Sequence, residues 1–241
     1  MEYSYRFRLY PTEAQEELMA KTFGCCRYVF NRFLDRRKTA YKETGTGLSY
    51  KECSKELTAL KKELPWLKEV DATALQASLK NLDRAYKNFF TGLKAGRRVG
   101  YPQFKAKKRD IPSFKATNNK GTVAIVGHSI RLPKIGYVDC RISKQVNGEI
   151  LSATVQQAKS GKYYVAINCK NVDLPSMPAT GYVVGIDLGL KDLAITSDGE
   201  KFDNPHTYAK NQKKLARLQR QLSRKTKGSH NREKAKLRVA R

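Results

Sequence analysis

Acidic side chains are scarce in this sequence of 241 residues. Lysine and arginine together number 48 against 22 aspartates and glutamates, so the formal net charge is +26. A positive excess of this size favours a polyanionic partner, and nucleic acid fits best. A membrane surface is the weaker alternative, and a small-molecule kinase would have no need of this charge.

Signals for metal binding and for targeting are also sparse. The sequence has five cysteines and three scattered histidines, with no Cys-x-x-Cys pair, so we expect no zinc site in this chain. An odd number of cysteines without a targeting signal suggests reduced, buried thiols in the cytosol. Met1 opens a strand-like segment, and no apolar run reaches transmembrane length. The predicted location is therefore the cytoplasm or nucleoid, with no membrane partner.

The first part of the chain reads as one strand followed by helices. Residues 3–10 alternate between apolar and polar positions, and Thr12 to Gln15 form a capping box that starts a helix. Gly24 is expected to break that helix, and a second one should run to about Lys42. Such a pair is either a groove-reading helix-turn-helix unit or an ordinary helical hairpin. Further helices are predicted over 50–64 and, after Asp71, to about Leu93.

A basic segment follows the last of these helices. Between Arg84 and Arg109 there is no acidic residue, and Tyr101 and Phe104 lie among the basic ones. This composition is typical of a segment whose basic side chains follow a nucleic-acid backbone while its aromatic rings stack on bases. The alternative is a basic loop that is merely solvated.

After Pro112 the apolar period changes to two. Strands are predicted over 113–118, 122–126, 129–132, 137–142, 150–158 and 162–169, separated by turns that contain glycine. Short strands at this spacing suggest a small barrel. The strand at residues 3–10 is expected to join it, which makes residues 12–110 a helical insertion, and a linker with Pro175 and Pro178 follows.

The segment 182–199 carries the candidate catalytic residue. Tyr182 to Ile186 has the pattern of a buried strand that ends at Asp187, and Ser197 to Gly199 reads as a hairpin turn. A carboxylate at the end of a buried strand is costly unless it is paired or binds a cation. Asp187 is thus a nuclease-type metal ligand, part of a phosphate loop, or a turn residue.

The remainder is a basic helical tract over 205–241 with a single acidic residue, Glu233. It is interrupted at Gly228 and Ser229 and resumes to the last residue. A narrow apolar seam consists of Leu215, Leu218 and Leu222. Basic side chains lie off this seam, one turn apart: Arg217, Arg220 and Arg224.

Several of these stretches together resemble one family. They are Tyr5 to Pro11, Gly24 to Asn31, Leu79 to Tyr86, Tyr101 to Lys105, Leu132 to Gly136, and Gly185 to Gly189. The chain resembles the N-terminal portion of TnpB-type proteins, the OrfB family of insertion-sequence transposase-associated proteins. Members of this family are RNA-guided DNA endonucleases related to type V CRISPR effectors.

The resemblance implies an α+β multidomain architecture. Residues 1–11 and 111–172 would form a wedge-type β-barrel, and residues 12–110 a helical recognition insertion. After a linker at 173–181, residues 182–241 would be the first part of an RNase H-like (RuvC) α/β domain. Asp187 would be the first of three carboxylates that hold two Mg²⁺ ions for phosphodiester hydrolysis.

The resemblance also implies partners and contact residues. A guide RNA would be held through its backbone while base pairing reads a double-stranded DNA target. We expect RNA contacts from Arg97, Arg98, Lys105, Lys107, Lys108, Arg217, Arg220 and Arg224. A short transposon-adjacent motif in the DNA would be read by Gln76, Lys80, Thr117 and Asn118, with a solvated polar surface as the alternative.

The catalytic site expected for the family is incomplete in this sequence. The later Glu and Asp ligands and the family's zinc ribbon would lie downstream of residue 241. We therefore expect a chain truncated within its RuvC domain that does not cleave DNA alone. It would need a longer form or a complementing C-terminal fragment, or it acts as a non-cleaving RNA- and DNA-binding module or repressor.

Overall fold

The computed structural model describes residues 1–173, 178 and 180–241. These residues divide into two units, with the boundary between Asp173 and Leu174. The linker predicted at 173–181 thus falls largely outside the described residues. No helix in the described ranges is both long and apolar enough to cross a bilayer. Each unit is described by itself.

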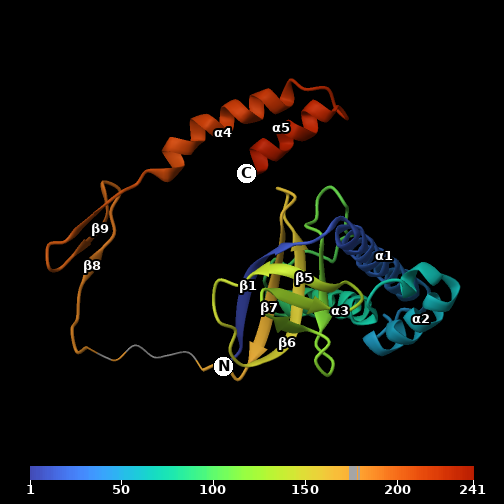
Figure 1. Ribbon diagram of the computed structural model, residues 1–241. Helices are drawn as coiled ribbons and strands as arrows, with labels where there is room; N and C mark the ends of the chain where they lie inside the picture. Colours follow the sequence, from blue (N-terminus) through green and yellow to red (C-terminus); the bar gives the residue numbers. More distant parts are fainter. Residues whose placement is uncertain (174–177, 179) are drawn as a thin grey trace. The chain divides into compact units, whose positions relative to one another are not determined.

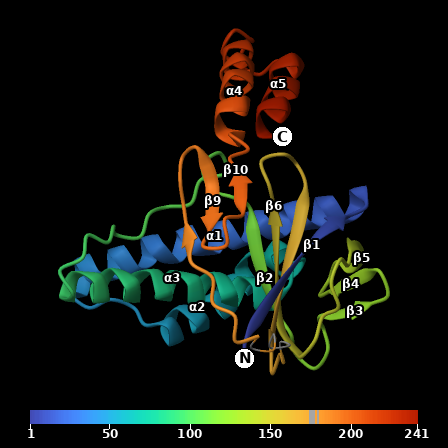
Figure 2. The ribbon, with the colours of Figure 1, turned by 90° about the vertical axis from the view of Figure 1, so that its left-hand side faces the viewer.

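The first unit combines a curled sheet with a group of helices (Figures 1 and 2). Its elements, in chain order, are β1 Tyr3–Tyr10, α1 Glu13–Thr44, α2 Tyr50–Glu63, the 3-10 helix η1 Pro65–Lys68, α3 Ala72–Lys94, β2 Ser113–Thr117, β3 Ala124–Val126, β4 Ser129–Leu132, β5 Gly136–Arg141, β6 Glu149–Gln157 and β7 Tyr163–Lys170. The fold is therefore α+β, as expected.

The seven strands form one sheet in the order β2-β6-β7-β1-β5-β4-β3, and every neighbouring pair is antiparallel. The first strand of the chain thus lies in the middle of the sheet, between β7 and β5. The outermost strands, β2 and β3, are not paired with each other, so the sheet is an open half-barrel. The small barrel expected from the strand spacing is thus present as a curled half-barrel sheet (Figure 1).

Helix α1 runs through the position where a break was predicted. It is continuous from Glu13 to Thr44, so the expectation that Gly24 ends a first helix is wrong. Glycine costs a helix only about 1 kcal/mol relative to alanine. The buried side chains of Phe23, Cys25 and Cys26 on either side of it pack into the core and outweigh that cost.

Capping residues fix the ends of the helices where the sequence indicated them. Thr12 and Ser49 each form a capping box, with Gln15 and Glu52 as their partners, and Asp71 caps α3. The predicted ranges 50–64 and 71–93 are confirmed to within a residue or two. Gly45, with φ of 70°, ends α1 in the left-handed conformation that glycine favours.

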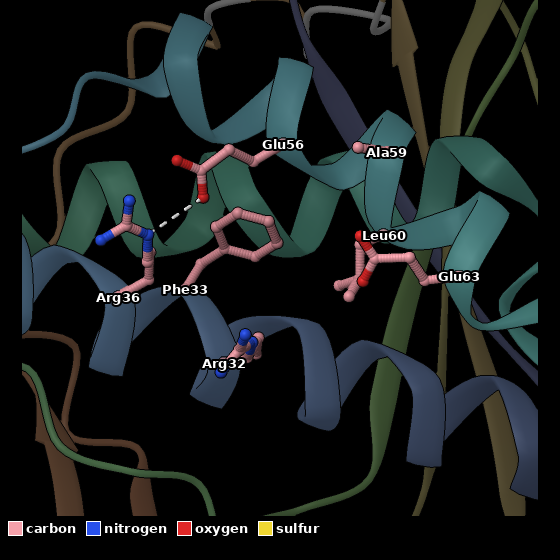
Figure 3. A pocket seen from close by; sticks show the side chains of 7 residues that line it. All are labelled: Arg32, Phe33, Arg36, Glu56, Ala59, Leu60 and Glu63. Carbon is pink, nitrogen blue, oxygen red and sulfur yellow. Dashed lines mark ion pairs between the residues drawn. The ribbon is translucent and has the colours of Figure 1, made fainter.

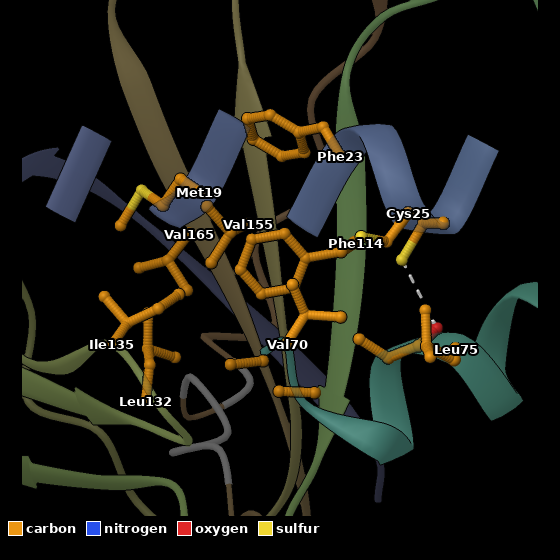
Figure 4. Close-up of a cluster of buried hydrophobic side chains, with 14 of the residues drawn as sticks. Met19, Phe23, Cys25, Val70, Leu75, Phe114, Leu132, Ile135, Val155 and Val165 are labelled. Carbon is orange, nitrogen blue, oxygen red and sulfur yellow. Dashed lines mark hydrogen bonds between the residues drawn. The ribbon is translucent and has the colours of Figure 1, made fainter. Parts of the chain in front are cut away.

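A single hydrophobic core joins the inner face of the sheet to the helices (Figure 4). The sheet contributes Phe114, Val155 and Val165, and α1 contributes Met19 and Phe23. The rings of Phe23 and Phe114 are 5.5 Å apart. Residues 1–173 therefore have a hydrophobic core of their own.

The second unit contains a small sheet and two helices. Its elements are β8 Ile186–Asp187, β9 Asp192–Thr196, β10 Lys201–Asp203, α4 Thr207–Ser223 and α5 His230–Ala240. The three strands are antiparallel in the order β10-β9-β8, and Gly199 closes the predicted turn with φ of 82°. The predicted interruption at Gly228 and Ser229 is confirmed, because Ser229 caps α5 there.

Candidate nucleic-acid interface and candidate metal ligand

Three of the residues predicted to read DNA lie on adjoining elements. Gln76 and Lys80 are exposed one turn apart on α3, and Thr117 is exposed at the end of β2. The backbone N–H of Thr117 donates to the hydroxyl of Thr73, 3.2 Å away, and Thr73 lies one turn before Gln76. The structure thus fixes the end of β2 against the first turn of α3, beside the predicted pair.

Asn118, the fourth predicted reader, has a different environment. Its amide nitrogen donates to the carbonyl of Ile150 at 2.8 Å, and its amide oxygen accepts from the N–H of Val123 at 3.0 Å. Both ends of the side chain therefore hold the β2–β3 connection. A base edge would have to compete with these internal bonds.

The basic segment after α3 is mostly open to solvent. Arg97, Arg98, Lys107 and Lys108 are exposed, as RNA contacts require. Lys105 is different because its backbone is held by the Asn31 amide, through bonds of 2.7 and 2.8 Å. Its ammonium lies 4.3 Å from the centre of the Phe30 ring, and burial lowers the pKa of this amine. Lys105 therefore anchors the segment to α1.

The aromatic residues of this segment also have partners. The Tyr101 hydroxyl is 2.8 Å from that of Tyr86, and its ring packs edge-on against Tyr86 and Phe89. Lys38 of α1 lies over the rings of Tyr101 and Phe104, 5.2 and 4.6 Å from their centres. Tyr101 thus attaches the segment to α3, and Phe104, which is 43% exposed, keeps a free surface for stacking.

The predicted arginines of the second unit lie on α4. Arg217, Arg220 and Arg224 are exposed, whereas Leu218 and Leu222 of the seam are half-buried. The sequence analysis missed a role for Arg232, whose guanidinium donates to the carbonyls of Leu222 and Lys225 at 3.0 and 2.7 Å. It thereby ties the first turn of α5 to the last turn of α4 and to the loop between them.

Asp187 lies at the end of β8, where it pairs with Ile195 of β9. It does not follow a buried strand, because Val183 is 89% exposed and Ile186 is 62% exposed. The expectation of a buried strand at 182–186 is therefore wrong for the described residues. A strand needs neighbours on both faces to be buried, and the small sheet provides none among them.

The metal site expected around Asp187 is not complete in the described part of the chain. No group of three or more His, Cys, Asp or Glu side chains there could hold an ion. Asp187 alone offers one carboxylate, which fits a single ligand position but not a two-ion site.

The five cysteines have no catalytic setting. All are free thiols and all are buried. Burial raises the pKa of each, to about 12 for Cys26 and about 11 for Cys140. Raised thiol pKa values disfavour the reactive thiolate at neutral pH, so these residues are core residues as predicted.

Two pockets of the first unit lack the features of a small-molecule site. One of about 160 Å³ lies between α1 and α2, where Arg36 and Glu56 form a 3.4 Å ion pair across it (Figure 3). Arg32 and Glu63 line it too, so its charges are mixed. A second of about 550 Å³ lies beside the β2–β3 connection and includes Asn118. Neither brings catalytic groups together.

A basic group that the sequence analysis did not single out lies on the sheet. Arg6 and Arg8 of β1 and Arg141 of β5 point away from the core, at positions that alternate with buried residues. Their alternation with apolar residues was visible in the sequence. What it could not show is that β1 and β5 are neighbours, which places Arg8 directly opposite Arg141.

Comparison with known proteins places the chain in a family. Residues 1–46 match a family model described as the OrfB/IS605 helix-turn-helix domain, and residues 163–241 match one described as a probable transposase. "Putative RNA-guided DNA endonuclease InsQ" of Escherichia coli K12 is 39% identical over 242 residues, 99% of this chain and 58% of that protein. The chain belongs to the OrfB family of TnpB-type proteins.

A second OrfB-family relative supports the same assignment. A protein of Streptomyces pristinaespiralis with the same descriptive name is 36% identical over 243 residues, again 99% of this chain and 58% of the relative. The chain thus spans somewhat more than half the length of these curated relatives. In the region of the helix-turn-helix model, residues 1–46, the structure holds one strand and the unbroken helix α1.

A solved structure was also found. A chain of the Cas12f1–sgRNA–target DNA complex matches with a TM-score of 0.36 and 13% identity, covering 93% of this chain and 62% of that chain.

Proposed function

We propose that this chain binds a guide RNA and a double-stranded DNA target as part of an RNA-guided DNA endonuclease. The observation that carries the proposal is 39% identity, across 99% of the chain, to a protein that bears this name. The net charge of +26 supports it, because two polyanions must be held at once. Such partners place the protein with the nucleoid in the cytoplasm and link it to transposition.

In this proposal the two units have different tasks. Residues 1–11 and 111–172 serve as the wedge-type part and residues 12–110 as the recognition insertion. Arg97, Arg98, Lys107 and Lys108 contact the RNA backbone, joined by Arg217, Arg220 and Arg224 of the second unit. Gln76 and Lys80, beside Thr117, read the motif next to the target. Their exposure and the Thr73 bond that fixes β2 to α3 support this role.

Residues 182–241 serve as the first part of a RuvC domain with an RNase H-like fold. Asp187 supplies one carboxylate to Mg²⁺, and further ligands come from a longer form or from a complementing fragment. When bound, the metal would activate water and stabilise the leaving oxygen of the phosphodiester. The task of this chain's own residue is to present a carboxylate at the end of β8.

The first test is to sequence the RNA that co-purifies with the 241-residue chain. A defined species with a constant scaffold and a variable end is the expected result. Recovery of bulk cellular RNA alone would contradict the guided function. The positive charge would then only attract nucleic acid nonspecifically.

The second test concerns Asp187. In a longer form, Asp187→Ala should abolish Mg²⁺-dependent cleavage of a DNA target that matches the guide, without changing RNA binding. Asp203→Ala, at the end of β10 in the same small sheet, is the matched control and should cleave normally. Cleavage retained by Asp187→Ala would overturn its assignment as a ligand.

A second candidate function is a non-cleaving RNA- and DNA-binding module or repressor. It is the alternative in which the net charge of +26 serves binding alone. It predicts tight, salt-sensitive RNA binding by the 241-residue chain together with no cleavage at any Mg²⁺ concentration. Cleavage by this chain alone would rule the module out.

A further inference from the structure

The last N–H group on the free edge of β2 has its partner outside the sheet. β2 is an outermost strand and pairs with β6 on one side, so every second N–H along it points away from the sheet. The N–H of Asn118 donates to the carbonyl of Leu151 on β6 at 2.9 Å, and the N–H of Thr117 therefore points the opposite way. It donates to the hydroxyl of Thr73 on α3 at 3.2 Å. A donor that the sheet leaves free is thus satisfied by a helix.

The direction of this hydrogen bond is set by Asp71, the residue that caps α3. One carboxylate oxygen of Asp71 accepts from the backbone N–H of Thr73 at 3.2 Å, and the other accepts from the Thr73 hydroxyl. A carboxylate only accepts hydrogen bonds, so the single proton of that hydroxyl is directed to Asp71. The lone pairs of the hydroxyl oxygen are left to accept from Thr117. Asp71, Thr73 and Thr117 thus form a chain of hydrogen bonds with a defined direction.

This chain of hydrogen bonds gives a fixed position to elements that otherwise meet through apolar side chains. Leu75 of α3 and Phe114 of β2 belong to the same hydrophobic core (Figure 4). Apolar burial is non-directional and tolerates a small slide of a strand along a helix, whereas a hydrogen bond weakens steeply with distance and angle. Among the hydrogen bonds of the described residues, the one between Thr117 and Thr73 joins β2 to α3. It therefore fixes where the end of the strand lies along the helix.

Thr73 lies on the same face of α3 as the two predicted motif readers. Gln76 and Lys80 follow it by three and seven residues, which places all three within about 60° of one another around the helix axis. At about 1.5 Å per residue, Gln76 lies about 4.5 Å and Lys80 about 10.5 Å along the axis from Thr73. The bond to Thr117 is thus at the end of the row that Gln76 and Lys80 continue.

The sheet holds the other side of this surface. The amide of Asn118, which follows Thr117, bonds to Ile150 of β6 and to Val123 in the connection to β3. The turn after β2 is therefore tied to the sheet and moves with it. The Thr73 hydroxyl then determines where this turn lies relative to α3.

We infer that Thr73 is a positioning residue for recognition of the motif next to the DNA target, and that it acts by holding Thr117 in place relative to Gln76 and Lys80. The inference rests on the proposed function, in which these three residues read the motif. Side chains from a helix and from a strand can bond neighbouring base edges at once only if the offset between the two elements is fixed. Thr73 supplies that offset without contacting the DNA itself.

The test compares Thr73→Val with the wild-type 241-residue chain, each purified with the RNA that it carries. The probe is a pool of DNA duplexes with a short randomised segment beside a target that matches the variable end of that RNA. Bound duplexes are sequenced, and affinities are measured for the enriched duplex and for one whose enriched motif is scrambled. Valine keeps the shape of threonine but neither donates nor accepts. We expect the ratio of the two affinities to fall about tenfold.

Hydrogen exchange gives a readout that does not involve DNA. The amide of Thr117 is protected by the Thr73 hydroxyl, so its exchange should become faster by on the order of tenfold in Thr73→Val. The amide of Asn118, whose N–H remains bonded to Leu151, should change by less than about twofold. The comparison of two adjacent amides separates loss of this one bond from general loosening of the strand.

Two control variants complete the experiment. Thr73→Ser keeps the hydroxyl and should retain the affinity ratio within about twofold. Thr58→Val removes an exposed hydroxyl on α2 that donates to the Ser54 carbonyl of the same helix at 3.2 Å. It should change neither the affinity ratio nor the exchange of Thr117 by more than about twofold. Loss of folded protein lowers both affinities by the same factor, so the ratio separates a positioning role from a structural one.

Asp71→Asn tests the same bond while the hydroxyl stays in place, and it decides the case if Thr73→Val does not fold. Asparagine caps helices about as well as aspartate, so α3 should still form. An amide offers one oxygen in place of two. With that oxygen on the helix N–H, the Thr73 hydroxyl loses the acceptor that directs its proton away from Thr117. We expect the affinity ratio to fall about threefold.

Each outcome has a definite meaning. A wild-type affinity ratio in folded Thr73→Val, or unchanged exchange of Thr117, overturns the positioning role and leaves the proposed function intact. An equal loss of both affinities makes Thr73 a structural residue only. If the wild-type chain enriches no motif from the pool, the motif reading of the proposed function fails, and this inference fails with it.

Discussion

Residues 1–173 and residues 180–241 use the same local signals but reach different degrees of packing. The first unit buries Leu9, Met19 and Ile167 almost completely, whereas no side chain described in β8–β10, α4 or α5 is buried. In both units, capping residues start helices and glycines with positive φ form turns. The contrast shows that local chemistry is enough for helices and hairpins, and that a core depends on which faces meet.

The largest change in the free energy of unfolding is expected when a buried side chain of the first unit is truncated. Leu9→Ala, at a residue that is 1% exposed in the central strand, should lower the free energy of unfolding by about 2–5 kcal/mol. Leu190→Ala, at a residue that is 91% exposed in the second unit, should change it by less than about 0.5 kcal/mol. Urea denaturation followed by circular dichroism measures both.

The same pair of variants can also contradict the difference in packing between the two units. A cost for Leu190→Ala close to that for Leu9→Ala would mean that the second unit is packed against something in solution.

Ion pairs provide the next test, with a smaller effect. Arg37 and Asp83 are 3.1 Å apart with side chains only 11% and 19% exposed, and the Arg37 Nε also donates to the Leu48 carbonyl. Asp83→Asn should cost about 1–3 kcal/mol, because it leaves a largely buried guanidinium without its charge partner.

The matched change in the second unit is Glu233→Gln. Its pair with Lys236 lies on α5 with both side chains about half exposed. Solvent screens such a pair, so the loss should stay below about 0.5 kcal/mol in the same denaturation experiment. Equal costs for Asp83→Asn and Glu233→Gln would show that burial does not separate the two ion pairs.

Two glycines give smaller effects than Asp83→Asn, with opposite signs. Gly24 is helical, and a Cβ added there meets nothing within 4 Å, so Gly24→Ala should stabilise the first unit by about 0.5–1 kcal/mol. Gly228 has φ of 87°, so Gly228→Ala should strain the α4–α5 turn and speed hydrogen exchange in α5. If Gly24→Ala lowered the stability instead, residue 24 would not tolerate an ordinary helical residue, as the predicted break at Gly24 requires.

Prediction from sequence succeeded where a local rule decides the outcome. Thr12 and Asp71 start helices because their side chains accept from the first free N–H groups. The alternation in residues 3–10 and 113–169 placed every strand of the large sheet to within two residues. These features depend on neighbours in the chain and need no knowledge of the fold.

The failures all concern contacts between distant residues. Gly24 resembles a helix break until the packing of Phe23 and Cys25 is known. Tyr182 to Ile186 has the composition of a buried strand, yet burial requires a partner surface that the described chain does not provide. Contacts between distant residues also place Lys105 beside Phe30 and Asn31 of α1, which the sequence did not indicate.

The sequence by itself determined the excess of positive charge, the family, the elements and the position of Asp187, because each is a property of composition or of short stretches. Tertiary structure alone decided that the first strand lies at the centre of the sheet, that Thr117 meets Thr73, and that Arg8 faces Arg141. The physical reason is that strand order and register join residues more than 40 positions apart, and no local preference encodes which of many possible pairings buries the most apolar surface.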